Sequence, residues 1–335
     1  MPLLSFFRTN QLSFGIFLLP IAVLLHYAGS FVVGAAAAPP PDPAAGPLGS
    51  VFTAWVGNYP LAASFVPPFL FGVQALLINA VIFRERLARR QNLFPGLLLV
   101  IGGCLLPAFL PLHSLQLANL FLLLSISPLL RIYRDIRYAT DLFQAGWWLG
   151  LAVLCNTSLL PLLPVYLVGI GSLRAISVRM WLMQLTGTLA AVFLAAAAFF
   201  LLGAWSLFVD GLPEFSYRFS FRPLVGLEWI GLLVPAALIV YAIFSSGPNY
   251  LNQNIEHRKK IQVIYYFLLG TVLSLLLVDP ITVAHWQITL VPLAMLLSLS
   301  LTRAAETTAR IVSILIVGLL LFIYLLPFLQ AGGFR

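Results

Sequence analysis

Charged residues are scarce in this sequence. Lys, Arg, Asp and Glu together make up 8% of the 335 residues, whereas hydrophobic residues make up 61%. A soluble domain has about 25% charged residues, so this chain has too few charges to cover a surface that faces water. The scarcity argues against an ordinary soluble protein and indicates that residues 1–335 form a single integral membrane domain.

Cysteine and histidine are sparse as well. The two cysteines, Cys104 and Cys155, lie in apolar runs where a thiol acts as a small hydrophobe, and no CxxC pair or disulfide framework is present. The four histidines stand singly, without the spacing of a zinc-binding motif. We therefore expect no metal site and no cofactor.

The few cations follow a regular pattern, because they gather in alternate gaps between the apolar runs. The groups are Arg84, Arg86, Arg89 and Arg90; Arg131, Arg134 and Arg137; Arg174 and Arg179; Arg258, Lys259 and Lys260; and Arg303 and Arg310. This alternation is the positive-inside pattern of a chain threaded repeatedly through a bilayer. The net charge of +8 forms no continuous basic face, so we expect contacts with lipid headgroups and no nucleic-acid partner.

Long apolar runs predict the fold class. A spanning helix needs about 20 apolar residues, and by that measure the chain has roughly 11 spans. They lie near residues 14–33, 61–82, 93–110, 115–130, 142–154, 159–171, 181–202, 225–244, 261–278, 286–301 and 311–329. We predict an all-α, polytopic transmembrane bundle in the bacterial inner membrane, with the N-terminus inside and the C-terminus outside.

Two parts of this topology have a second interpretation. Polar residues 156–158 and two following prolines interrupt residues 142–171, which form either two spans or one broken hairpin. The cations on both sides favour two crossings. The first span, with Arg8 before it and alanines 35–38 after it, also resembles a signal peptide. We favour an uncleaved helix, because the apolar stretch is longer than the apolar part of a usual signal peptide.

Two outer loops are candidates for function. The first, residues 36–60, contains a Pro/Ala/Gly linker that is expected to be extended or irregular, because proline lacks the donor a helix needs. The second, residues 203–224, alternates aromatic and polar residues over 215–222. In an extended conformation the rings face one side, while Arg218 and Arg222 face the other. This geometry suits a lipid phosphate; the alternative is an aromatic belt with two arginines that reach the headgroups.

Outer carboxylates are candidates for a general base. They are Asp42, Asp210, Glu214, Asp279 and, near the outer end of the eighth span, Glu228. The alternatives are a solvated loop for Asp42, a turn at Asp210 and a helix stop at Asp279. Glu228 lies in an apolar run, where a charge needs a partner, so we expect it to pair with an outer arginine. His285 begins a span at the outer interface, where it serves either as an anchor or as a donor to phosphate.

Three stretches resemble the C-type glycosyltransferases, which use lipid-linked phosphosugars. Residues 142–152 (LFQAGWWLGLA) and 158–164 (SLLPLLP) resemble a helix with Ala-Gly and Gly-Leu-Ala and the proline-bearing helix after it. Residues 79–84 (NAVIFR) resemble the inner end of the second helix in that family, and 285–294 resembles a late helix that ends in Pro-Leu-Ala. The layout is also similar to a bacterial multi-span family of unknown function. The resemblance implies a shared membrane scaffold and a polyprenyl-phosphate-linked substrate.

The family pattern is incomplete at its acidic positions. After the first helix only Asp42 is available, and residues 111–114, at the second acidic position, hold no carboxylate. The large soluble outer domain of many members is also missing. The prolines, alanines and glycines around Asp42 offer no evident support for a base. We therefore predict that Asp42→Ala leaves function largely intact, and that any activity depends on another outer carboxylate such as Glu228.

Two functions of different class follow from these features. In the first, a glycosyltransferase-like scaffold binds a polyprenyl-phosphate-linked substrate at the outer face in envelope biogenesis, with Asp42 as base and Arg218, Arg222 and His285 on the phosphate. In the second, the same scaffold is a non-catalytic membrane assembly or accessory protein. A transporter is less favoured, since no inverted repeat or pair of intramembrane charges is visible. Membrane lipids are the expected partners, and the sequence leaves open whether the protein is an enzyme.

Overall fold

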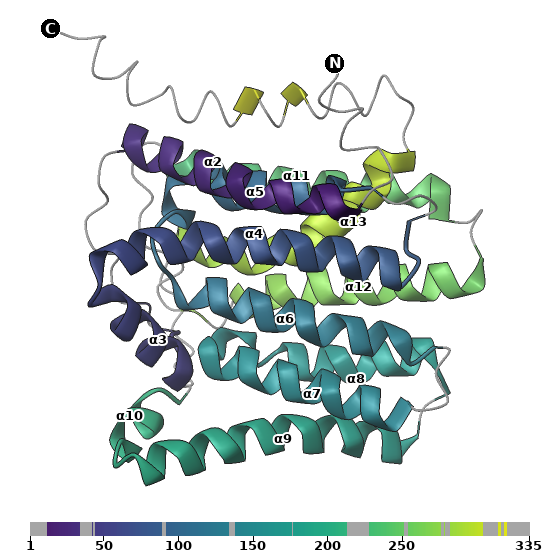
Figure 1. The fold of residues 1–335 in the computed structure, drawn as a ribbon. Helices are drawn as coiled ribbons and strands as arrows, with labels where there is room; N and C mark the ends of the chain where they lie inside the picture. The colour runs from purple at the N-terminus through teal and green to yellow at the C-terminus, as the bar shows by residue number, and fades with distance from the viewer. Residues whose placement is uncertain are drawn as a thin grey trace, which may run out of the picture.

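Helices form the whole of the described framework. The computed structural model describes residues 12–33, 42, 44–88, 92–133, 138–175, 177–212, 228–250, 254–275, 278, 282–303, 314–315 and 318–319, and none of them lies in a β-strand. The elements are η1 (Leu12–Phe17), α2 (Leu18–Val33), α3 (Pro47–Gly57), α4 (Pro60–Arg84), α5 (Phe94–Leu105), η2 (Pro107–Phe109), α6 (Ser114–Arg131), α7 (Tyr138–Cys155), η3 (Thr157–Leu159), α8 (Leu162–Leu173), α9 (Val178–Leu201), α10 (Trp205–Asp210), α11 (Glu228–Tyr250), α12 (Ile255–Leu275), η4 (Val283–Thr289) and α13 (Leu290–Arg303) (Figure 1). The predicted all-helical fold is confirmed for these residues.

Several of these helices are long and apolar enough to cross a membrane. Four described segments qualify, namely α4, α6, α9 and the continuous segment of η4 and α13 over Val283–Thr302. Four shorter apolar segments are Gly15–Phe31, Phe94–Leu105, Thr157–Leu173 and Leu233–Phe244. These segments agree with a membrane protein. The count of roughly 11 spans and the orientation of the termini stay predictions.

Residues 142–171 contain two helices with a break between them. Helix α7 ends at Cys155, and α8 begins at Leu162. The side chain of Asn156 accepts a hydrogen bond from the backbone N–H of Ser158 (3.2 Å) and caps η3. This local side-chain bond takes the place of an α-helical backbone hydrogen bond at the position where the sequence predicted an interruption.

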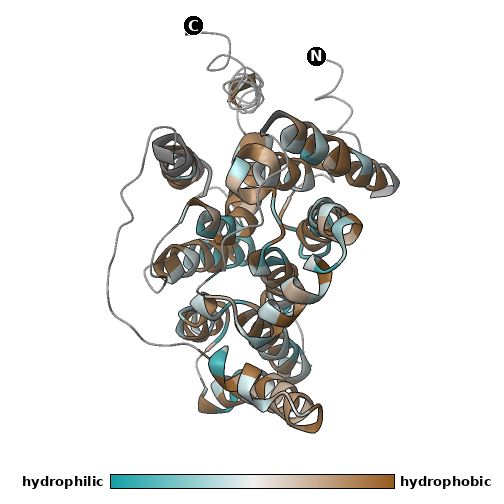
Figure 2. Cartoon of the chain, turned by 90° about the vertical axis from the view of Figure 1, so that its left-hand side faces the viewer, coloured by the Kyte–Doolittle hydropathy of each residue, from teal (hydrophilic) through white to brown (hydrophobic). Residues whose placement is uncertain are grey.

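The long helices lie side by side (Figure 1), and hydrophobic residues are spread along all of them (Figure 2). Many large hydrophobic side chains are exposed, among them Phe193, Phe200 and Leu201 of α9. Helix α7 packs between α6 and α9. Glycines make the α7–α9 contact close, because a Cβ atom on Gly146 would lie 2.0 Å from the carbonyl oxygen of Gln184. The hydroxyl of Thr188 donates to the carbonyl of Gly146 (3.0 Å). Small residues with such interhelical hydrogen bonds are typical of helix packing in membranes.

Cationic residues gather at one end of the bundle. Arg131 closes α6 and lies 3.5 Å from Asp141 in the first turn of α7. The guanidinium of Arg174, after α8, lies 4.5 Å from the ring centre of Tyr138. Lys260, near the start of α12, contacts Glu85 at the end of α4. We call this end the cationic end. Because α6 has 18 residues, its first residue, Ser114, lies about 27 Å away at the opposite end.

Candidate functional site

A polar cluster lies at the end of the bundle opposite the cationic end. It consists of Asp42, Ser114, Asn156 and His285, and we call it the Asp42 cluster. The hydroxyl of Ser114 and the side-chain amide of Asn156 donate to Asp42 Oδ2 at 2.7 and 2.9 Å. The Nε2 atom of His285 lies 3.1 Å from Asp42 Oδ1, which also accepts from the backbone N–H of Ala44 at 3.0 Å. The carboxylate therefore accepts four hydrogen bonds, and its side chain is only 10% exposed.

Backbone pairing places Asp42 in this position. Ala45 and Asn156 form an isolated antiparallel bridge. The N–H of Gly46 donates to the carbonyl of Cys155 (3.0 Å), and the N–H of Thr157 donates to that of Ala44 (2.9 Å). A Cβ atom on Gly46 would lie 2.2 Å from the carbonyl oxygen of Leu154, so the close approach requires glycine. The break after α7 thus supplies the backbone groups that fix the residues around Asp42.

Hydrogen bonds also fix the tautomer of His285. The backbone N–H of Thr282 points to His285 Nδ1 at 3.1 Å, and an N–H can only donate. Nδ1 is therefore an acceptor, and the proton of the neutral ring sits on Nε2 and donates to Asp42. The hydroxyl of Thr282 lies 2.8 Å from the same Nδ1 atom. Both ring nitrogens of His285 are engaged within the protein.

The surroundings tune the protonation of this cluster. Burial raises the pKa of Asp42, but the hydrogen bond and electrostatic interaction with His285 and the donors Ser114 and Ala44 outweigh burial, so the pKa lies below its ordinary value of 3.8. Burial lowers the pKa of the neighbouring His113, although the Asp42 carboxylate opposes this effect. Near neutral pH Asp42 is therefore ionised. A carboxylate with a low pKa and no unused acceptor position is a weak general base.

The structure brings together two of the predicted site residues, Asp42 and His285. The expectation that Asp42 has no support is wrong, because four donors hold it and the backbone around it is paired. His285, which we expected either to anchor a helix or to donate to a phosphate, contacts this carboxylate through Nε2. Arg218, Arg222 and the side chain of Glu228 lie outside the described residues, so the structure does not place them. Among the other outer carboxylates, Asp210 is exposed on α10.

Ser114 and Asn156 were not predicted as site residues. Their partner Asp42 is 72 and 114 residues away in the sequence, so neither has a local pattern that reveals the contact. Two features of the sequence nevertheless point to these residues. Ser114 lies in the segment 111–114, where the resemblance places a second acidic residue, and Asn156 interrupts an apolar run.

A second cluster of charges lies at the cationic end. It contains Glu85, Arg131, Asp141, Glu256 and Lys260, and we call it the Glu85 cluster. Lys260 Nζ lies 3.3 Å from Glu85 Oε2 and 3.2 Å from Glu256 Oε1. Burial raises the pKa of Glu85 above its ordinary value of 4.5, whereas Lys260 and Arg131 oppose the rise. No sequence pattern indicated these ion pairs, which join the ends of α4, α6, α7 and α12.

Comparisons with known proteins add no relative to this description. No protein-family model matches the chain, and no curated protein and no solved structure is significantly similar to it. The resemblance to C-type glycosyltransferases therefore stays a prediction.

Proposed function

We propose that this chain is a multi-pass protein of the bacterial inner membrane that binds a lipid-linked, polyprenyl-phosphate substrate at its outer face. The observation that carries the proposal is the Asp42 cluster, a fixed polar site at the end of an apolar bundle. The cations gather at the other end, which the positive-inside pattern assigns to the cytoplasm. On this assignment the Asp42 cluster faces outward, at the depth of the lipid headgroups.

The outer loop between α10 and α11 supplies the groups for the phosphate in this proposal. Arg218 and Arg222 precede α11 in the sequence, and α11 packs against η4, which carries His285. Arginine suits a phosphate because its planar guanidinium donates two parallel hydrogen bonds. The Asp42 cluster then has a positioning role, because it fixes η4 and the first outer loop beside the phosphate site.

A specific observation favours a non-catalytic member of this class, such as an assembly or accessory protein. Asp42 has a lowered pKa and four accepted hydrogen bonds, and both nitrogens of His285 are engaged. Neither residue offers a free basic atom to an incoming hydroxyl. A glycosyltransferase that used Asp42 as base would first have to release one of these donors. Binding without transfer is therefore the function that this geometry supports better.

Lipid analysis of the purified protein tests the proposed function. We expect polyprenyl phosphate or its glycosylated form to co-purify with the wild-type protein, as detected by mass spectrometry. The double variant Arg218→Ala/Arg222→Ala should lose this lipid at an unchanged folded yield. Arg86→Ala/Arg179→Ala is the matched control, since both arginines are exposed and belong to the cation groups of the other end. Retention of the lipid by the first variant, or its loss from the control, would contradict the proposal.

The orientation has a separate test in cysteine labelling. Arg86 and Asp210 are both exposed, whereas the native Cys104 and Cys155 are buried. We expect a membrane-impermeant maleimide to label Asp210→Cys in intact cells and to label Arg86→Cys only after permeabilisation. Labelling with the opposite sidedness would place the Asp42 cluster in the cytoplasm and refute the proposed outer site.

A further inference from the structure

Two short helices, α3 and α10, lie at the end of the bundle that carries the Asp42 cluster, beside the stack of long helices (Figure 1). Helices α4 and α9 have 25 and 24 residues, whereas α6 and α7 have 18 each. All four reach the cationic end, because ion pairs join α4, α6 and α7 there, and α7 contacts α9 through residues near the start of both helices, Gly146 and Gln184. At about 1.5 Å per residue, α4 and α9 therefore extend roughly 10 Å beyond α6 and α7 at the other end. Helices α3 and α10 lie in the step that this difference leaves (Figure 1).

Helix α3 is seated on the ends of α6 and α7. A Cβ atom on Gly49 would collide with the carbonyl oxygen of Cys155 and would lie 2.8 Å from Cβ of Ser114, so glycine is what allows this close approach. The start of α3 also contacts the end of α10, because a Cβ atom on Gly211 would lie 2.8 Å from Cα of Pro47. The two helices therefore form one unit, and we call α3, α10 and the adjoining Tyr59 the outer platform.

The exposed face of the outer platform is apolar and aromatic. Val51, Trp55 and Tyr59 follow one another at intervals of four residues, and all three are exposed. Trp205 and Leu207 of α10 are exposed as well. The sequence contains no Lys, Arg, Asp or Glu from residue 43 to residue 83, or from residue 180 to residue 209. A helix that faces water carries charged or polar residues on its outer side, so this composition indicates surroundings other than water.

The length of α9 shows how deep the outer platform lies in a membrane. Arg179, in the first turn of α9, belongs to the cations that the positive-inside pattern assigns to the cytoplasmic headgroups. The hydrocarbon core is about 30 Å thick, and an upright helix crosses it in about 20 residues. Counted from Arg179, α9 leaves the core near Phe199. Helix α10 packs at that level, because the ring centres of Phe208 and Phe199 lie 5.7 Å apart and those of Trp205 and Phe200 lie 6.1 Å apart.

The length of α4 gives the same level for α3. Arg84 is the last residue of α4 at the cationic end, and a distance of about 20 residues toward the start of the helix leads to Ser64. Tyr59, the cap at the start of α4, therefore lies just beyond the hydrocarbon core, and α3 ends two residues before it. Two helices of the bundle thus place both parts of the outer platform at the boundary between hydrocarbon and headgroups.

We infer that the outer platform is a membrane-binding surface that lies in the headgroup region of the outer leaflet. Trp55, Tyr59 and Trp205 insert among the lipids there, because their rings are apolar while the indole N–H and the phenol O–H stay hydrated. The platform continues a surface that already faces lipid, since Phe200 and Leu201 are exposed at the end of α9, directly before α10. This inference requires no bound substrate and shares only the orientation of the chain with the proposed function.

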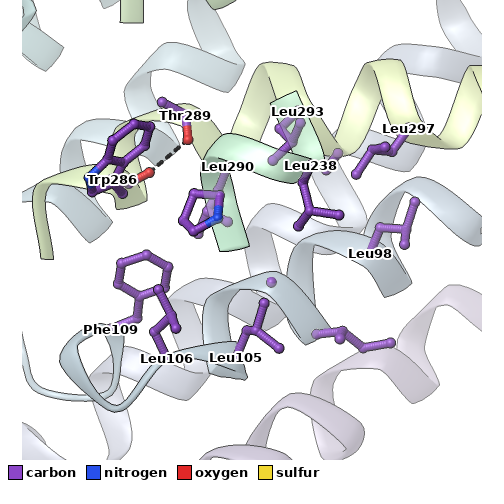
Figure 3. Close-up of a pocket in the computed structure, with 14 residues that line it drawn as sticks. Leu98, Leu105, Leu106, Phe109, Leu238, Trp286, Thr289, Leu290, Leu293 and Leu297 are labelled. Carbon is purple, nitrogen blue, oxygen red and sulfur yellow. Dashed lines mark hydrogen bonds between the residues drawn. The ribbon is translucent and has the colours of Figure 1, made fainter. Parts of the chain in front are cut away.

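Another tryptophan at this end of the bundle has different surroundings. Trp286 lines an apolar pocket together with Phe109 of η2 and Leu290 of α13 (Figure 3). The indole of Trp286 therefore packs within the bundle, whereas Trp55 and Trp205 are 64% and 48% exposed. Trp286 serves below as a control at the same end of the protein.

Spin labels on the full-length protein in nanodiscs test the inference. The labels are attached to Val51→Cys and Leu207→Cys, and their collisions with oxygen and with a water-soluble nickel chelate are measured by power saturation. Arg86→Cys is the control for water, because Arg86 is exposed at the cationic end. Phe193→Cys is the control for hydrocarbon, because Phe193 is exposed on α9 between Arg179 and Phe199. The native cysteines are buried, so the label reports the engineered position.

We expect the ratio of oxygen to nickel collisions at both platform positions to lie between the ratios of the two controls. A ratio equal to that of Arg86→Cys would mean that the platform faces water, and one equal to that of Phe193→Cys would mean that it lies within the hydrocarbon. Few collisions with either reagent would mean that a protein partner or a second copy covers it. Each of these three results would overturn the inference, while the lipid that co-purifies would still decide the proposed function separately.

A second measurement uses aromatic substitutions, which leave the backbone and most of the ring contacts in place. Tryptophan fluorescence is quenched by lipids that are brominated either near the glycerol or near the middle of the acyl chain. We expect Trp55→Phe and Trp205→Phe each to reduce the quenching by the shallow bromines more than the quenching by the deep ones, and to reduce it more than Trp286→Phe does. A reduction no greater than that of Trp286→Phe, or an equal reduction at both depths, would overturn the inference.

Discussion

Substitution of Asp42 by alanine should strongly destabilise the protein. The change removes the acceptor for three buried side chains, Ser114, Asn156 and His285. A buried donor without a partner costs about 1–3 kcal/mol. One bond in the cluster survives, because the Asn156 amide also donates to Ser114 Oγ (3.0 Å). Because Ser114 and His285 both lose their acceptor, we expect a loss of about 2–6 kcal/mol in the free energy of unfolding.

Thermal unfolding of the purified protein in detergent measures this loss. The unfolding temperature of Asp42→Asn should lie between those of the wild type and Asp42→Ala. Its amide oxygen still accepts from Ala44 and His285, but its NH₂ group faces the donors Ser114 and Asn156. Asp210→Ala is the matched control, since that carboxylate is exposed on α10. An Asp42→Ala variant that unfolds at the wild-type temperature would refute the structural role of the cluster. Complementation by Asp42→Ala at normal protein abundance would then test our sequence-based prediction that this variant keeps most of the function.

Three further predictions concern the two clusters and the α7–α9 contact. The lowered pKa of Asp42 means that this carboxylate binds a proton less readily in the folded state than in the unfolded state. The stabilisation by the Asp42 carboxylate is therefore present above pH 4 and is lost as the pH falls below the ordinary pKa of 3.8. Unfolding measured at several pH values should show this loss, and Asp42→Asn should abolish it. Lys260→Met should destabilise the protein more than Glu85→Gln does, because it removes the cation that pairs with both Glu85 and Glu256, whereas Glu85→Gln leaves Lys260 paired with Glu256; equal unfolding temperatures would contradict this. Gly146→Leu should reduce the folded yield, whereas Gly57→Leu, with open space around its Cβ position, should not; equal yields would show that α7 and α9 do not pack closely.

The sequence predicted the helices better than their contacts. Apolar runs and the polar residues that interrupt them are local features, so the sequence alone reveals them. The predicted helix at 61–82 and the predicted interruption at 156–158 agree with α4 and η3. The helix α3 was missed. It begins at Pro47 inside the predicted first outer loop, where a proline is tolerated in the first turn because its missing donor would be unpaired there anyway.

Contacts between distant segments explain what the sequence did not reveal about the candidate site. Asp42 lies in a linker rich in proline and alanine that suggests a solvated loop, yet its partners come from α6, from the break after α7 and from η4. Lys260 and Glu85 are 175 residues apart, and each alone looks like an ordinary charge beside a span. Only the packing of the helices brings such residues together. The composition and the local pattern therefore predicted the fold class, whereas the two buried clusters required the structure.

The central claim is that a lipid phosphate binds at the end of the bundle that carries the Asp42 cluster. The most direct measurement is a cryo-electron microscopy map of the protein purified with its native lipids in nanodiscs. The account predicts a headgroup density at the end of the bundle that carries the Asp42 cluster. A headgroup density only at the cationic end, or no ordered lipid at the end with the Asp42 cluster, would contradict it.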